Sequence, residues 1–168
     1  MLDFSRIRIK IVLKRTKKEG RMIPLNPWEH QNAIKSLYSK CVEAVCDKHS
    51  LTRMELDILL FLANNPLFDT ASDIVQIRCL SKSQVSAAVG LLEKRNFLKK
   101  SYAGNNRKTV HLEICQEAAD AVQDGKAAQE RFLQIIFKGI PEKEIEAMKR
   151  ANVQMLNNIH EYLKEESK

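Results

Sequence analysis

A capped amphipathic helix with a defined end, expected over 81–95, constrains the fold of this chain most strongly. Ser81 is a typical N-cap, and Gln84 stands three residues later, where a capping-box partner is expected. Asn96 follows the charged "EKR" and favours the left-handed conformation that ends helices, with Phe97 as the accompanying hydrophobic contact. One side of the helix is an apolar stripe that predicts burial against a core, formed by Val85, Ala88, Val89 and Leu92.

Two short strand-like runs follow directly, at 97–101 and 108–114. In the second run apolar and polar side chains alternate, which predicts a strand with one buried face. The intervening "YAGNNR" contains a glycine and two asparagines, which tolerate the positive φ of a tight turn. A further cap at 70–73 begins a short helix, so the order is short helix, turn, longer helix, hairpin. That order predicts a winged helix-turn-helix.

Two further helix starts lie upstream. The stretch "NPWE" (26–29) supplies an N-cap, a first-turn proline and a first-turn acid, and helical spacing then predicts a helix over 27–48. The stretch "TRME" (52–55) is a capping box that begins a strongly apolar helix, which is expected to end before Pro66.

Beyond the strands, helices are expected from 116 to 138, ending at Gly139, and again from Pro141. The last helix carries a seam of side chains at alternating spacings of three and four, with Asn152 at one apolar position. This seam either packs within the monomer or joins two subunits. We favour a subunit interface, because a winged helix alone would leave the seam and the first helix uncovered. The expected interface residues are Ile34, Leu37, Ile145, Met148, Asn152, Met155, Ile159 and Tyr162.

The predicted fold class is mainly α with a small β-hairpin wing. We expect a single domain over 22–168, with the winged helix-turn-helix at 52–114 and dimerisation helices at 27–48 and 115–166. Residues 1–21 match no part of this pattern. We interpret them as a basic extension that folding does not require, either disordered or not native because the start codon is set too early. The alternation in "RIRIKIVL" could instead form an added strand or an arm that grasps DNA.

Positive charge is concentrated in two blocks. Lys and Arg outnumber Asp and Glu by eight to two in 1–21 and again in 72–112, whereas the other segments are slightly acidic. A basic block inside an otherwise acidic chain indicates a surface for a polyanion. The alternative is a solvated face that only improves solubility.

From about residue 27 to 166 the order of parts resembles the MarR family of winged-helix transcription regulators. The stretch "TASDIVQIRCLSKSQVSAAVGLLEKRNFLKK" is similar to the family's run of Thr, an acid and an apolar residue, then Leu-Ser-Lys-Ser, then Leu-Glu-Lys before a turn. The resemblance implies a cytoplasmic homodimer that binds a near-palindromic double-stranded DNA operator. It also implies repression that responds to a small-molecule inducer.

By that resemblance the segment from Ser81 lies on the recognition helix, which enters the major groove, and Arg107 lies at the wing tip. Lys, Gln and Ser side chains can reach base edges, whereas Lys94, Arg95 and the strand lysines are suited to phosphates. The expected DNA-binding residues are Ser81, Lys82, Ser83, Gln84, Ser86, Ala87, Lys99, Lys100, Asn105, Asn106, Arg107 and Lys108.

The sequence departs from the family pattern in the wing, in the recognition helix, in the turn before that helix, and after the wing, where "LEICQEA" replaces a small residue. Asn105 replaces the wing aspartate that orients the arginine. Ala87 stands where many members carry a long polar side chain, and Cys79 stands in the turn where a glycine or small polar residue is common. The departures at Ala87 and Asn105 keep a second function open, that of a MarR-like dimer which binds a protein or small ligand and does not read an operator.

No motif for catalysis, nucleotide binding or zinc is present, so we expect no enzyme activity, no cofactor and no metal. Four scattered cysteines indicate reduced thiols in a cytoplasm rather than a disulfide framework. Cys41 lies near the region where thiol-sensing members of the family keep a reactive cysteine, although a free cysteine is more often a small buried apolar residue. No signal peptide or membrane span is recognised, so no membrane partner is expected.

Overall fold

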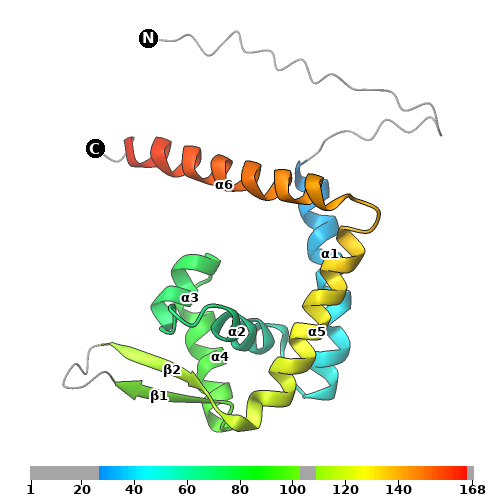
Figure 1. The fold of residues 1–168 in the computed structure, drawn as a ribbon. Coiled ribbons are helices and arrows are strands. Elements are labelled where there is room, and N and C mark those ends of the chain that lie inside the picture. The colour runs from blue at the N-terminus through cyan, green and yellow to red at the C-terminus, as the bar shows by residue number, and fades with distance from the viewer. Residues whose placement is uncertain (1–26, 103–108, 166–168) are drawn as a thin grey trace. The chain divides into compact units, whose positions relative to one another are not determined.

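The computed structural model describes residues 27–102 and 109–165 (Figure 1). The chain divides into two units, Met1–Ser36 and Leu37–Lys168. The basic extension at 1–21 lies outside the described residues. The elements, in chain order, are α1 (Pro27–Lys48), α2 (Arg53–Asn64), α3 (Ala71–Arg78), α4 (Lys82–Lys94), β1 (Leu98–Tyr102), β2 (Val110–Ile114), the 3-10 helix η2 (Gln116–Ala118), α5 (Ala119–Ile136) and α6 (Glu142–Glu165).

The predicted capping box before α2 and the predicted cap before α3 are both confirmed. Before α2, the Glu55 backbone N–H donates to the Thr52 hydroxyl at 3.2 Å, and the Thr52 backbone N–H donates to the Glu55 carboxylate at 2.7 Å. Thr70 and Asp73 form the same reciprocal pair at the start of α3, at 3.1 and 3.0 Å. These bonds satisfy backbone donors that a helix start leaves without partners, and they set where each helix begins.

The start of α4 forms a modified cap. The Gln84 backbone N–H donates to the Ser81 hydroxyl at 3.2 Å, as a capping box requires. The Gln84 side-chain oxygen, however, accepts from the Ser81 hydroxyl at 2.8 Å. The expected capping box is therefore present in its first half, and a side-chain contact takes the place of the second half.

The end of α4 is the Schellman arrangement that Asn96 predicts. Asn96 has a φ of 57°. Its backbone N–H donates to the Glu93 carbonyl at 2.9 Å, and the Phe97 N–H donates to the Leu92 carbonyl at 2.9 Å. The predicted stripe beneath α4 is buried in full. Its burial fixes which face of α4 points outward.

The core is centred on α2, which packs against α4 and α5. Most apolar side chains of α2 are buried, and Leu56 and Leu59 are inaccessible to solvent. Gly125 of α5 makes this packing close, because a Cβ there would lie 2.8 Å from a methyl carbon of Leu60. The buried residues that α5 presents are all small, namely Ala121, Gly125 and Ala128.

The hairpin is a two-stranded antiparallel sheet with Leu98 opposite Ile114 and Lys99 opposite Glu113. The strands begin one or two residues later than predicted. The start of α3 anchors the hairpin, because the Leu112 N–H donates to the Asp69 carbonyl at 2.8 Å. His111 Nδ1 also lies 2.8 Å from an Asp69 carboxylate oxygen. The hairpin is thus tied to the segment before α3 through the middle of β2.

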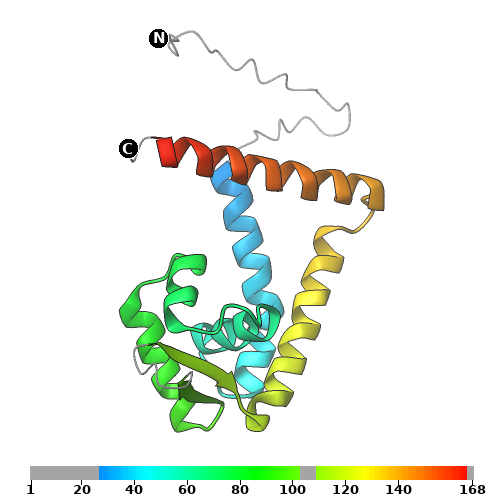
Figure 2. The same cartoon turned by 60° about the vertical axis from the view of Figure 1, so that its left-hand side comes forward.

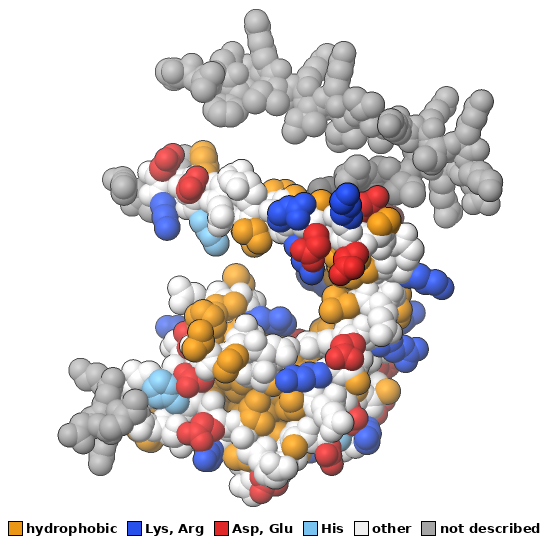
Figure 3. Space-filling view, viewed as in Figure 1, with side chains coloured by type: hydrophobic (Ala, Val, Ile, Leu, Met, Phe, Trp, Pro, Cys, Tyr) orange, Lys and Arg blue, Asp and Glu red, His pale blue; other side chains and the backbone are white. Residues whose placement is uncertain are grey.

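The segment after the hairpin begins with η2 and continues as α5, so the helix expected from 116 starts with a 3-10 turn. Figure 2 shows α5 leading from the base of the hairpin to the turn before α6. Gly139, with a φ of 78°, lies in that turn. Among the described residues of α6 none is buried, and Figure 3 shows apolar side chains reaching the surface along it. None of the described helices is long and apolar enough to span a membrane.

Candidate nucleic-acid interface

The first two turns of α4 present a polar, exposed surface above the buried stripe. The cap residue Ser81 precedes this surface, and its hydroxyl lies 3.2 Å from that of Ser83. Among the described residues, no carboxylate lies within ion-pair distance of Lys82. The residues predicted for this face are all exposed, namely Ser81, Lys82, Ser83, Gln84, Ser86 and Ala87. A free ammonium beside amide and hydroxyl groups can meet both phosphates and base edges.

A hollow of about 560 Å³ adjoins this face, between α3, α4 and the hairpin. Apolar side chains of α3, α4 and β2 line it, including Val75, Val89 and Leu112. Lys82 and Lys100 contribute the two cationic groups of its lining. The hollow therefore combines apolar contact with positive charge, directly beside the start of α4.

The two strand lysines predicted to contact phosphate are exposed, and each is paired with a glutamate. Lys99 lies 2.7 Å from Glu113 across the two strands, and Lys100 lies 2.6 Å from Glu93 of α4. The hydrogen bond to Glu113 raises the pKa of Lys99. Hydrogen bonds from Lys99 and Ser101 lower the pKa of Glu113. A phosphate would have to compete with these carboxylates for the two ammonium groups.

Arg95 makes contacts within the chain that the sequence did not predict. Its guanidinium donates to the Ser50 carbonyl at 2.8 Å and to the His49 carbonyl at 2.7 Å, and lies 4.4 Å from the centre of the Phe97 ring. Arg95 thus joins the end of α4 to the loop between α1 and α2. A phosphate contact by Arg95 stays a prediction, and the guanidinium would have to leave these carbonyls to make it, whereas Lys94 is exposed.

The described chain brings part of the predicted DNA-binding set together. Lys82, Ser86 and Lys100 line one hollow, and Lys99 lies on the same hairpin. The wing-tip residues predicted for this set, Asn105, Asn106, Arg107 and Lys108, lie outside the described residues.

The predicted interface residues of α6 carry large exposed apolar side chains, as a partner-binding seam would. Met155 is 53% exposed and Tyr162 is 61% exposed, and Met148 and Ile159 are similar. Asn152 is exposed, whereas Ile34, Leu37 and Ile145 are partly buried. Sequence reasoning missed Leu156 and Leu163, which are also exposed. Their spacing of four residues after Asn152 and Ile159 places them on the same helix face and could have identified them.

No group of His, Cys, Asp and Glu among the described residues is arranged to hold a metal ion. All four cysteines are free thiols, and Cys79 is the exposed one. Cys79 ends α3 with a φ of 51° and a ψ of 43°, which is the left-handed region. Burial raises the pKa of the Cys46 thiol. A raised pKa keeps Cys46 protonated, which makes it a poor nucleophile.

The capped α3–α4 pair, the hairpin tied to it and the flanking long helices define a winged helix-turn-helix protein with helical extensions. Residues 49–107, most of this winged segment, match the sequence model of the MarR family. The resemblance predicted from the sequence is therefore confirmed, and the fold is that of MarR-family transcriptional regulators.

Solved structures of that fold cover most of the chain. A putative MarR-family regulator from Listeria monocytogenes, crystallised with a 26mer DNA, has a TM-score of 0.70 and 20% identity, covering 79% of this chain and 87% of its own. MepR of S. aureus in complex with DNA has a TM-score of 0.65 and 16% identity, covering 80% and 96%. A MarR protein from Peptoclostridium difficile has a TM-score of 0.69 and 12% identity, covering 90% and 99%. Comparison with curated protein sequences gives no match.

Proposed function

We propose that this protein is a DNA-binding transcriptional regulator that acts as a homodimer on a near-palindromic operator. The observation that carries the proposal is the exposed polar face at the start of α4, held outward by a fully buried stripe. Lys82 has no carboxylate partner among the described residues and is available to a phosphate or a guanine edge. Two solved structures of the same fold contain DNA, which supports the same reading.

The dimer part of the proposal rests on α6. Its large apolar side chains are about half exposed in the single chain, and burying them against a second copy would remove them from water. A two-fold dimer presents two recognition helices about one duplex turn apart, so the operator half-sites would be about 10 bp apart.

The hollow beside α4 supports the further proposal that a small ligand regulates binding. Its volume of about 560 Å³ lies within the range of ligand sites, which is roughly 300–1,000 Å³. Lys82, Ser86 and Lys100 line it and are also proposed DNA contacts. A ligand seated there would compete with DNA for the same side chains, which would make the protein a ligand-responsive repressor.

The test is a titration of the purified protein against duplexes from the region around its own gene, with random duplexes of equal length alongside. Specific affinity should exceed random affinity, and Lys82→Ala should weaken both. Lys126→Ala, an exposed lysine of α5, is the matched control and should bind as the parent protein does. Equal, weak binding to every duplex would contradict the proposal.

One observation favours a second function, a dimeric interaction or sensor protein without operator reading. The carboxylates of Glu93 and Glu113 already occupy both strand lysines, and Ala87 offers no polar group at its exposed position. Under this alternative the hollow would bind ligand with the same affinity in the presence and absence of DNA. The titration separates the two functions, because this alternative predicts equal, weak binding to every duplex.

A further inference from the structure

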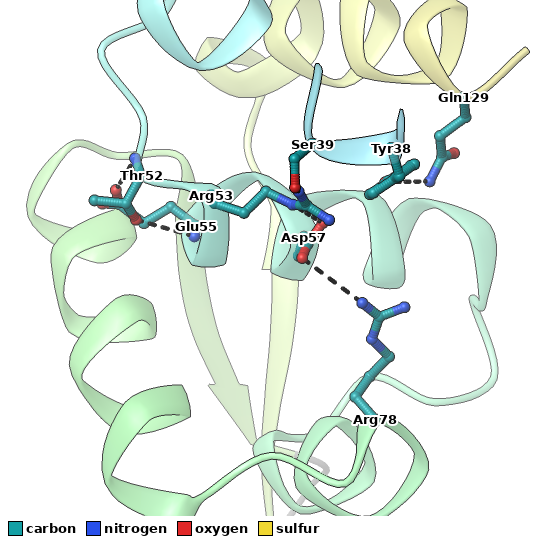
Figure 4. Close-up of polar contacts among 8 residues, drawn as sticks. All are labelled: Tyr38, Ser39, Thr52, Arg53, Glu55, Asp57, Arg78 and Gln129. Carbon is teal, nitrogen blue, oxygen red and sulfur yellow. Dashed lines mark hydrogen bonds and ion pairs between the residues drawn. The ribbon is translucent and has the colours of Figure 1, made fainter. Parts of the chain in front are cut away.

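Asp57, in the second turn of α2, is shared by two arginines from different elements (Figure 4). One carboxylate oxygen accepts from Arg53 Nε at 3.0 Å. The other oxygen lies 3.7 Å from Arg78 Nη2. The Asp57 side chain is only 15% exposed, so the two cations offset most of the cost of removing its charge from water.

The Arg53 branch leads to α1 and α5. Arg53 Nη1 donates to the Ser39 hydroxyl at 2.9 Å, and its guanidinium carbon lies 4.4 Å from the centre of the Tyr38 ring. The Tyr38 hydroxyl accepts from Gln129 of α5 at 3.2 Å, and its ring meets Phe132 edge-on, with centroids 5.1 Å apart. Burial raises the pKa of Tyr38, so the hydroxyl stays neutral in this contact.

The contact with Arg78 leads to α4. Arg78 is the last residue of α3, and the left-handed Cys79 follows it. The Leu80 N–H donates back to the Val75 carbonyl at 3.1 Å, and Ser81 then caps α4. Only three residues therefore separate Arg78 from Lys82, the first residue of α4.

The two arms of Asp57 differ in strength. The contact to Arg53 has hydrogen-bond geometry, whereas the contact to Arg78 is longer and involves a side chain that is 45% exposed. Exposed pairs of this kind add little to the stability of the fold. The Asp57–Arg78 contact is thus placed to set the position of the turn rather than to hold the domain together.

We propose that Asp57 is a positioning residue that ties the turn between α3 and α4 to α1 and α5, so that it controls operator affinity without contacting DNA. The inference rests on the proposed function. Anything that shifts Tyr38 or Ser39 against α2 would reach the start of α4 through Arg53, Asp57 and Arg78.

The first test measures DNA binding by full-length Asp57→Asn. We expect operator affinity to fall by roughly five- to tenfold, as is typical of coupling residues outside a binding site. The dependence of affinity on salt should keep its slope, because no phosphate contact is removed. Arg78→Gln should give a similar loss, and the double variant should lose no more than either single one. Glu43→Gln, an exposed acid of α1, controls for the change of charge.

The proposal would be overturned by unchanged affinity in Asp57→Asn, by tighter binding because a freed Arg78 reaches phosphate, or by losses that add in the double variant. A lower salt slope in Arg78→Gln alone would show a direct phosphate contact and would overturn it too. Arg53→Lys is the conservative check. Lysine keeps the charge but cannot hold Asp57 and Ser39 together, so it should reproduce part of the loss.

A second measurement needs no DNA and so separates this inference from the proposed function. Hydrogen exchange at the backbone amides of residues 79–84 should be faster in Asp57→Asn than in the parent protein. Exchange at the buried centre of α2 should be unchanged. Equal exchange at 79–84 would refute the positioning role even if the parent protein binds its operator. If the parent protein does not bind DNA but exchange at 79–84 is faster in Asp57→Asn, the proposed function is refuted. The positioning role of Asp57 then still stands.

Discussion

Lys100 of the hairpin donates a hydrogen bond to Glu93 of α4 at 2.6 Å, so a predicted phosphate contact is held by a carboxylate of the helix beside it. The pair links β1 to the end of the recognition helix. Both side chains remain partly exposed, at 43% and 29%, so the pair adds little stability. Its main consequence is that Lys100 is less available to DNA than Lys82 is.

Removing that carboxylate should therefore strengthen DNA binding. We expect Glu93→Gln to raise affinity for operator and random DNA alike, because the released ammonium can reach a phosphate. The slope of log affinity against log salt should steepen by about 0.9, the value for one added phosphate contact. Glu117→Gln, an exposed acid of η2, carries the same charge change and should have no such effect. A steeper slope in both variants would show a general charge effect instead.

Gln84 should carry sequence preference rather than overall affinity. Its side-chain oxygen is held by the Ser81 hydroxyl at 2.8 Å, which orients the amide at the exposed start of α4. Gln84→Ala should cost roughly 1–3 kcal/mol on the preferred operator and little on random DNA. A binding-site selection with both proteins would measure the change. An identical selected sequence from both would show that Gln84 reads no base.

Replacing Cys79 by glycine should stabilise the fold. Cys79 lies at a φ of 51°, where a Cβ meets the following carbonyl and a glycine does not. We expect Cys79→Gly to raise the free energy of unfolding by roughly 0.5–1.5 kcal/mol. The midpoint of thermal unfolding should rise by about 2–5 °C. Cys79→Ala removes the thiol but keeps the Cβ, so it should give no gain. Equal gains in both would assign the effect to the thiol.

Charges introduced into the exposed face of α6 should separate the subunits. Met155 and Ile159 are each about half exposed in the single chain, and burial of a charge in their place would be costly. Sedimentation of the Met155→Lys, Ile159→Glu double variant should therefore show a monomer. Glu161→Lys, on the other side of α6, should remain a dimer. A parent protein that is monomeric yet binds DNA fully would contradict the dimer.

Asp124 should contribute to stability only above acidic pH. Hydrogen bonds from Lys48 and His49, both at 2.7 Å, lower the pKa of its carboxyl from the ordinary 3.8. Because the pKa of this carboxyl is lower in the folded protein, its contribution to the free energy of unfolding is fully present above the ordinary pKa of 3.8. The contribution is lost as the pH falls through the lowered, folded-state pKa. Chemical unfolding of Asp124→Asn and the parent protein should thus converge at low pH. A difference that persists unchanged in strong acid would contradict this assignment.

Local signals in the sequence predicted where the helices of this fold begin and end. The side chains of Thr52, Thr70 and Ser81 each accept a hydrogen bond from the backbone N–H three residues later. Asn96 lies two residues after the last residue of α4 and ends that helix. Such local interactions can be inferred without knowledge of the tertiary structure. The apolar stripe of α4 is likewise a local periodic pattern. Such signals also identified which face of α4 points outward.

The contacts that the sequence did not reveal join distant positions. Arg95 bonds to carbonyls 45 and 46 residues earlier, and nothing near it in sequence announces those partners. Arg78 meets Asp57 only in the tertiary fold, which brings the end of α3 within reach of α2. The pairing of Lys99 with Glu113 depends on the hairpin register, which sequence placed only to within two residues. Side-chain partnerships of this kind are set by packing rather than by local propensity.

The missing side chain at Gly125 determines how α5 can slide along α2. Methyl carbons of Leu60 and Leu56 lie 2.8–3.2 Å from where a Cβ of residue 125 would be, so the leucines occupy a notch of one residue. A slip of α5 by about one helical turn would bring Ala121 or Ala128 to that notch. Each would meet the leucines with a single methyl group. At this point of the interface, the register between the two helices is therefore held by a step of one methyl group.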